Sequence, residues 1–253
     1  MKPTHSLPPR FKRVGGVALG ITAVVALLAM AGCSYSRLQV AKELVARSDP
    51  FQAQPAAPVA SLLVIGDSTA VGTGASSPAH SVAGMISASH PNLRTVNRAV
   101  NGARYADFEQ QLRQNPEHFD VVLVLGGGND VMRLTGEDAL RTSIREVATL
   151  AKVRANTVIL MPPGNVGNAP FFYPPVTWLM TRRSQALHAL IRQAAQDAGV
   201  IYVNLYKPRS EDPFAQRPDE THAGDGLHPS DEGYRLWLED LRKQARLDAL
   251  LTK

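Results

Sequence analysis

The hydrophobic positions of the chain fall into short continuous runs that are separated by longer segments with helical spacing. Runs rich in valine, isoleucine and leucine stand at residues 62–65, 121–125, 158–161 and 200–205, with a weaker run at 95–100. Continuous apolar runs of this length are typical of strands that are buried on both faces, as in a parallel sheet. The pattern therefore predicts about five strands.

Helices are expected between these runs, over residues 78–89, 104–114, 136–153 and 176–198. In the last of them, apolar side chains recur every three or four residues, and Gly199 follows as a C-cap. A final helix is expected after Ser230, which serves as its N-cap. The alternation of strands and helices predicts an α/β domain of three α/β/α layers around a central parallel sheet of about five strands.

A separate apolar stretch precedes this domain. Residues 14–32 are apolar or small without interruption, follow four basic residues, and lead into Cys33, the only cysteine of the chain. A basic start, an apolar segment and small residues at its end are typical of an export signal. With a single cysteine, an intramolecular disulfide is excluded.

The end of the apolar stretch is similar to a bacterial lipobox. Ala31 and Gly32 precede Cys33, which would be lipidated, although Met30 stands where a leucine is usual. We therefore expect residues 1–33 to be an export signal with a lipidated cysteine, or else an uncleaved membrane anchor, with free secretion as the third alternative. All three place the rest of the chain outside the cytoplasm, and the first two attach it to the membrane of the cell envelope through the N-terminus.

The segment that follows, residues 34–60, contains one possible short helix over 38–46 and then a stretch rich in alanine, proline and glutamine. Such a composition predicts a tether or a wrapping arm without a core of its own. The folded domain is expected to span residues 61–253.

The positive charge of the chain is confined to its start. The formal net charge is +5, and removing the four basic residues ahead of Cys33 from the 27 leaves 23 against 22 acidic residues. A nearly neutral domain has no electrostatic footprint of nucleic-acid binding, so nucleic acid is not an expected partner.

Candidate chemistry stands directly after the predicted strands, where ligands bind in an open parallel sheet. The run at 62–65 leads into a Gly-Asp-Ser sequence that ends at Ser68. The run at 95–100 leads into Gly102, and the run at 121–125 leads into three glycines and Asn129. Asp225 and His228 lie three residues apart just before the final helix. Each feature alone is compatible with a turn or a cap. Together they supply the nucleophile, the base, its acidic partner and the hydrogen-bond donors that acyl transfer requires.

Three other kinds of site fit the sequence poorly. The glycine run at 126–128 is not followed by the Lys-Ser/Thr of a P-loop, and Ser68 does not lie in the Gly-x-Ser-x-Gly of an α/β-hydrolase. The spacing of His222, Asp225 and His228 matches no common metal motif. We therefore expect neither a metal nor a cofactor.

The order of these blocks resembles the SGNH (GDSL-type) hydrolase family over residues 61–245. The resemblance implies that Ser68 is the nucleophile, His228 the base and Asp225 the acidic member of a catalytic triad. It also implies an oxyanion hole made by the backbone N–H groups of Ser68 and Gly102 with the side-chain amide of Asn129. The flavodoxin-like strand order 2-1-3-4-5 is a further implication of the family.

The expected activity is that of a cofactor-independent serine esterase that hydrolyses carboxylic esters, whether small acyl esters, lipids or acylated glycans. A thioesterase or transacylase on the same scaffold and a catalytically idle surface binding protein are the alternatives. The long loop after the fourth strand is expected to be functional. Its aromatic residues either line an acyl pocket or pack the loop onto the sheet: Phe171, Phe172, Tyr173 and Trp178.

Two acidic residues beside the candidate site are expected to be structural. Asp67 precedes Ser68 and Asp130 follows Asn129. Short acidic side chains in such positions commonly accept hydrogen bonds from nearby backbone N–H groups. We expect both to hold loops rather than to take part in the chemistry.

Overall fold

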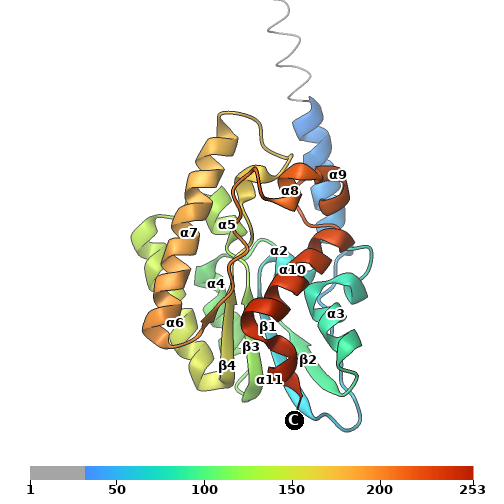
Figure 1. The fold of residues 1–253 in the computed structure, drawn as a ribbon, viewed down its shortest axis with the longest axis vertical. Helices are drawn as coiled ribbons and strands as arrows, with labels where there is room; N and C mark the ends of the chain where they lie inside the picture. The colour runs from blue at the N-terminus through green and yellow to red at the C-terminus, as the bar shows by residue number, and fades with distance from the viewer. Residues whose placement is uncertain (1–31, 253) are drawn as a thin grey trace, which may run out of the picture.

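A five-stranded parallel sheet lies between two layers of helices in the computed structural model, which describes residues 32–252 (Figure 1). The strand order is β2-β1-β3-β4-β5, and every neighbouring pair is parallel. The predicted α/β fold and its strand order are therefore confirmed. The strands are β1 (Ala60–Gly66), β2 (Leu93–Asn97), β3 (Phe119–Leu125), β4 (Ala155–Met161) and β5 (Ile201–Tyr202).

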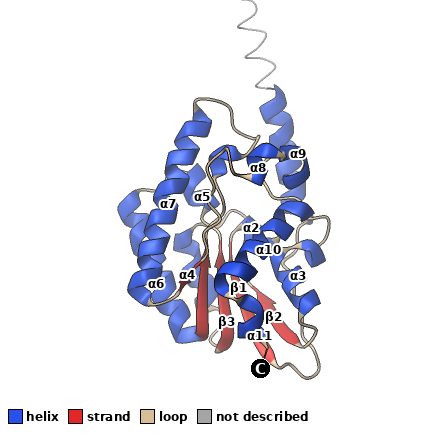
Figure 2. Ribbon diagram, in the orientation of Figure 1, coloured by secondary structure: helices blue, strands red, loops and turns tan. Residues whose placement is uncertain are grey.

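Helices cover both faces of the sheet (Figure 2). The central strands therefore bury side chains on both faces, which explains their continuous apolar sequences. In β1, Leu62 and Val64 pack into one apolar cluster, while Leu63 and Ile65 pack into the other. The first cluster is covered by α3 (Val82–Ser89), α10 (Asp231–Ala245) and α11 (Leu247–Leu251). The second is covered by α4 (Tyr105–Arg113), α6 (Glu137–Arg154) and α7 (Val176–Ala198).

The long helices end where their caps predict. Gly199 ends α7 in the left-handed conformation with φ 63°. The Ser230 hydroxyl accepts a hydrogen bond from the N–H of Gly233 at 3.2 Å and so begins α10. Several one-turn helices were not predicted as separate elements: α2 (Ser68–Val71), α5 (Gly128–Met132), α8 (Pro213–Gln216), α9 (Pro218–Thr221), η1 (Pro78–His80) and η2 (Val166–Asn168).

Strand β5 is shorter than the apolar run at 200–205 predicts. Only Ile201 and Tyr202 pair with β4, although Val203 and Leu205 are also buried. Beyond the strand, the N–H of Asn204 donates to the side chain of Gln244 in α10 at 2.8 Å. The N–H of Val203 still donates to the carbonyl oxygen of Leu160 in β4 at 3.0 Å, so the chain leaves the sheet at Asn204, whose N–H binds a helix side chain instead.

The segment before β1 lies against the domain. It begins with a helix over residues 32–47, drawn in blue in Figure 1, on which Leu44 is buried. Further along, the Gln52 amide donates to the carbonyl oxygen of Asn97 at 2.7 Å, and Ala53 forms an antiparallel bridge with Thr95 of β2. Residues 52–59 thus follow the β2 edge of the sheet.

The predicted export signal lies outside the described residues up to position 31. Cys33 is exposed on the helix described over residues 32–47. Among residues 32–252, no helix combines the length and the apolar composition needed to cross a membrane.

Candidate active site

Ser68 lies at the carboxyl end of β1, where it begins the single turn of α2. Asp67 is the N-cap of this turn, and its Oδ1 accepts hydrogen bonds from the N–H and the hydroxyl of Thr69 at 2.9 and 2.8 Å. The turn brings Ser68 Oγ within 3.0 Å of Nε2 of His228, which comes from the other end of the sequence. A hydroxyl at this distance from an imidazole nitrogen can give up its proton to it.

The other ring nitrogen of His228 is held by Asp225, with 2.6 Å between Nδ1 and Oδ2. The second carboxylate oxygen of Asp225 accepts the N–H groups of Leu227 and His228 at 2.9 and 3.0 Å. Burial raises the pKa of Asp225, but the hydrogen bonds from His228 and the backbone outweigh it and hold the pKa below its ordinary value. An ionised Asp225 keeps the proton on Nδ1 and leaves Nε2 to accept the proton of Ser68.

Asp67 and Asp130 both bind backbone groups of neighbouring loops, as expected. Besides capping α2, Asp67 accepts the N–H groups of Gly127 and Gly128 at 2.9 and 3.2 Å and so joins the loops after β1 and β3. Burial raises the pKa of Asp67, and the hydrogen bonds from Thr69 and Gly127 oppose that rise. Asp130 accepts the N–H of Tyr105 at 2.9 Å, which ties α5 to α4.

Asn129 stands on the first turn of α5 and faces the same cavity as Ser68 and His228. Its side-chain amide donates to the carbonyl oxygen of Ala103 at 3.2 Å, which uses one of its two hydrogens and orients the group. Gly102 lies in the turn after β2 with φ 79°, and it is not among the residues that line the cavity.

A cavity of about 200 Å³ opens beside Ser68. The loop after β4 supplies part of its wall through Val166 and Ala169. Segments near the end of the chain supply another part, with Phe214 of α8 and Trp237 of α10 packed against each other at 5.6 Å between ring centres. Lys207 and Asp240, which form an ion pair, also line the cavity. The cavity therefore combines an apolar wall with one charged side.

The aromatic residues of the long loop take other places. None of the four lines this cavity. Phe172 packs against the apolar cluster beneath α6 and α7, and Phe171 contacts Phe172 edge-on with 5.1 Å between ring centres. Trp178 projects outward from α7. Of the two alternatives for these aromatic residues, Phe171 and Phe172 therefore agree with packing of the loop onto the domain and not with lining of an acyl pocket.

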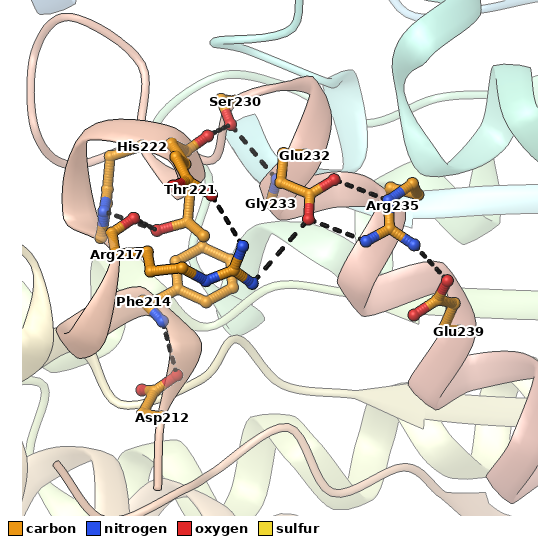
Figure 3. A network of polar contacts seen from close by, with 11 residues as sticks. Asp212, Phe214, Arg217, Thr221, His222, Ser230, Glu232, Gly233, Arg235 and Glu239 are labelled. Carbon is orange, nitrogen blue, oxygen red and sulfur yellow. Dashed lines mark hydrogen bonds and ion pairs between the residues drawn. The ribbon is translucent and has the colours of Figure 1, made fainter. Parts of the chain in front are cut away.

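A network of polar contacts around α8 and α9 holds the part of the cavity wall that contains Phe214 in place (Figure 3). The ring of His222 lies edge-on to Phe214 at 5.2 Å, and its Nδ1 donates to the carbonyl oxygen of Pro218 at 3.1 Å. Burial lowers the pKa of His222. Arg217 pairs with Glu220 at 2.7 Å and with Glu232 of α10 at 4.0 Å. Within residues 32–252, no three His, Cys, Asp or Glu side chains gather as a metal site requires.

Residues 64–236 match the profile of the GDSL-like Lipase/Acylhydrolase family. The chain belongs to this family. The match runs from β1 into α10 and includes Ser68, Asn129, Asp225 and His228. The protein is accordingly an enzyme of the acylhydrolase and esterase class.

Solved structures share the fold of this GDSL-like acylhydrolase. TesA matches with a TM-score of 0.59 and 21% identity, over 76% of this chain and 99% of that one. A catalytic mutant of Axe2, an acetylxylan esterase from Geobacillus stearothermophilus, matches with a TM-score of 0.56 and 20% identity, over 76% and 96%. A member of the lipolytic G-D-S-L family from Veillonella parvula matches with a TM-score of 0.57 and 15% identity, over 72% and 96%. A comparison with curated protein sequences found no match.

The sequence did not identify the apolar wall of the GDSL-like acylhydrolase. Trp237 is also a buried member of the apolar cluster beneath α10, and Phe214 lies in a segment rich in charged residues, so neither residue stands out in the sequence as a cavity wall. A local signal was nevertheless present. Asp212 caps α8 by accepting the N–H of Phe214 at 3.1 Å, and Pro213 occupies the first helical position. Asp-Pro therefore marks the helical turn that presents Phe214.

Proposed function

We propose that this GDSL-like acylhydrolase is a serine esterase in which Ser68 attacks the ester, His228 is the base and Asp225 orients that base. One observation carries the proposal. The side chains form a continuous chain of hydrogen bonds, 3.0 Å from Ser68 to His228 and 2.6 Å from His228 to Asp225, on the wall of a cavity.

In the first half-reaction, Ser68 Oγ bonds to the ester carbonyl carbon while its proton passes to Nε2 of His228. The carboxylate of Asp225 stabilises the resulting imidazolium. The negative oxygen of the tetrahedral intermediate accepts hydrogen bonds from the Asn129 amide and from the N–H groups of Ser68 and Gly102. The bond to the alcohol then breaks, and His228 returns the proton to the departing alcohol.

The second half-reaction repeats these steps with water. His228 takes a proton from a water molecule that attacks the acyl-serine, and it returns the proton to Ser68 as the acid leaves. Each proton that is transferred in the cycle passes through Nε2 of His228. The reaction needs no group beyond the side chains and backbone donors of the site.

The cavity supports esters with an apolar acyl group as substrates, because Val166, Ala169, Phe214 and Trp237 form its wall. Acetylated saccharides are also among the esters to test, since Axe2, which shares the fold, is an acetylxylan esterase. Lipids and small acyl esters complete the series.

The test is the hydrolysis of p-nitrophenyl acetate, butyrate and octanoate by the purified full chain in detergent. We expect Ser68→Ala to lower kcat by roughly 10⁴-fold or more. Asn129→Ala should lower kcat by about 10²- to 10³-fold with little change in KM, because its amide acts on the developing oxyanion.

Ser89→Ala is the matched control, since Ser89 is exposed at the end of α3 and its hydroxyl binds a backbone carbonyl of that helix and the partly exposed Arg242 side chain. It should keep wild-type activity. Equal turnover by the wild type and Ser68→Ala would eliminate Ser68 as the nucleophile. Wild-type turnover of thioesters but not of any oxygen ester would favour the thioesterase alternative.

We also propose that the enzyme works in the cell envelope and that Cys33 is its lipidation site. The uninterrupted apolar stretch at 14–32, the small residues Ala31 and Gly32 and the exposure of Cys33 support this location. An uncleaved anchor made by the same stretch is the alternative.

A further inference from the structure

The amino-terminal end of α7 exposes three large apolar side chains within its first four residues. Val176, Trp178 and Leu179 are 42%, 67% and 44% exposed. Exposed apolar residues that occur singly need no explanation, but a contiguous group on a helix end marks a contact surface. The group belongs to none of the contacts that build the candidate active site.

Leu134 extends this apolar group. It is half-exposed just after α5 and adopts φ 54°, which is unusual for a leucine. The Arg183 guanidinium donates to the carbonyl oxygen of Thr135, the next residue. Leu179 lies one helical turn before Arg183 on the same face of α7, so it stands on the side of the helix that meets the segment of Leu134.

The helix over residues 32–47 reaches the same end of the molecule (Figure 1). Arg37 donates from Nη1 to the carbonyl oxygen of Pro170 and to the hydroxyl of Tyr173, just before α7 begins. Tyr35 and Leu38, on either side of Arg37 in the sequence, are exposed. We call the combined surface the apolar edge. It consists of Tyr35, Leu38, Leu134, Val176, Trp178 and Leu179.

The charges beside the parts of the apolar edge on α7 and on the helix over residues 32–47 are basic, whereas Glu137 and Asp138 follow Leu134 in the sequence. Residues 32–42 and 162–196 contain no aspartate or glutamate, and they include Arg37, Arg182 and Arg183. Arginines beside exposed aromatic and aliphatic side chains match the interface of a bilayer with anionic headgroups. Tryptophan and tyrosine are favoured at that depth because their rings have both an apolar body and a polar group.

The sequence before the helix indicates what this surface meets. The apolar stretch at 14–32 leads in the sequence directly into the helix that is described from residue 32 onward. Whether the stretch is a membrane anchor or precedes a lipidated Cys33, its end belongs at a bilayer surface. Leu38 follows Cys33 by five residues, which is about 7.5 Å along a helix, so the apolar edge starts within reach of that surface.

We propose that the apolar edge inserts into the lipid surface to which the N-terminus of the same chain is attached. The active-site cavity then stands next to the bilayer, because its wall at Val166 belongs to η2, and η2 packs on the first turns of α7. This docking is independent of the proposed esterase chemistry. It gives the enzyme a fixed orientation on the membrane in place of a free tether.

The two tryptophans allow a direct test, since Trp178 is 67% exposed and Trp237 is 6% exposed. The full chain is reconstituted into phosphatidylcholine–phosphatidylglycerol vesicles with and without brominated acyl chains, which quench tryptophan on contact. We expect brominated lipid to quench the emission of the wild type. Trp178→Phe should abolish this quenching, because only Trp237 then emits.

A tryptophan at the opposite end of the sheet is the control. Val153 is also 67% exposed and lies at the end of α6, just before β4 begins. In the Trp178→Phe background, Val153→Trp should show no quenching by brominated lipid. Ser68→Ala should be quenched like the wild type, so a failure of the esterase proposal leaves this result unaffected.

Two results would overturn the proposal. One is wild-type emission that brominated lipid does not change. The other is equal quenching of Trp178 and of the tryptophan placed at position 153, which would mean that the enzyme tumbles without orientation. If a photo-reactive amino acid placed at position 178 cross-links two copies and brominated lipid does not quench the wild type, the edge is a self-association surface and the proposal is overturned as well.

Discussion

His188 shows how a buried side chain outside the candidate triad is held in one protonation state. Its Nε2 donates to the carbonyl oxygen of Pro163 at 2.8 Å, and its Nδ1 accepts from the hydroxyl of Tyr202 at 2.7 Å. Burial, more than any other cause, lowers the pKa of His188 to about 4. The neutral imidazole thus links α7, the loop after β4 and the edge strand β5.

This shift makes the stability of the enzyme depend on pH. The unfolded chain binds a proton at His188 near the ordinary pKa of 6.5, whereas the native protein does so only near 4. The stabilisation is therefore complete above pH 6.5 and is lost as the pH falls toward 4, by roughly 2–3 kcal/mol at pH 4.5. Urea unfolding at pH 7.5 and 4.5 should show a smaller loss in His188→Gln than in the wild type.

The control for this measurement is His118→Gln, because His118 is exposed and its ring binds the Asn156 side chain. This variant should keep the pH dependence of the wild type. An identical loss of stability in the wild type and in His188→Gln would refute the role assigned to His188.

Among the elements, η2 depends on one glycine for its contact with α7. A Cβ added to Gly167 would lie 2.2 Å from the Thr181 hydroxyl and 2.3 Å from the carbonyl oxygen of Thr177. We expect Gly167→Ala to lower the free energy of unfolding by about 1–3 kcal/mol and to reduce kcat/KM for esters, because η2 must move away from α7 and takes Val166 with it.

Gly136→Ala is the comparison for Gly167→Ala, since a Cβ at Gly136 meets no atom within 4 Å. Its cost should be about 0.5 kcal/mol, the loss of a favourable N-cap residue of α6. Thermal unfolding and p-nitrophenyl ester hydrolysis measure both variants. Equal effects of the two substitutions would show that the close packing of η2 on α7 is unimportant.

The elements also show what the sequence can and cannot predict. The long helices and the central strands were predictable because their side-chain periods follow from burial on one helical face or on both faces of a sheet. Because the candidate residues follow such strands, Ser68 and Asn129 could be found from the sequence as well. The one-turn helices have no period to read, since they have only three to five residues, and α8 carries a local signal in its Asp-Pro start. Phe214 takes its place in the wall through its contacts with Trp237 and His222, which are distant in the sequence.

At the scale of the whole molecule, the attachment of the chain to the membrane can be tested at a single side chain, Cys33. If Cys33 is lipidated, cells that express the full chain and are fed an alkyne-labelled fatty acid should label the wild type. Cys33→Ser should lose the label completely, because Cys33 is the only cysteine. Labelling that persists in Cys33→Ser would contradict lipidation at this residue. An unlabelled wild type that stays in the membrane fraction would favour the uncleaved anchor.

The bridge between Ala53 and Thr95 has a consequence for how these molecules meet one another. A strand at the margin of a sheet presents unpaired N–H and C=O groups, and a second molecule can add a strand to them. Here the segment before β1 occupies that position along β2, with Gln52 binding the backbone of Asn97 from both ends of its amide. The other margin, β5, offers only two residues. Both margins are thus protected against strand addition, which lets such enzymes crowd on a surface without joining their sheets.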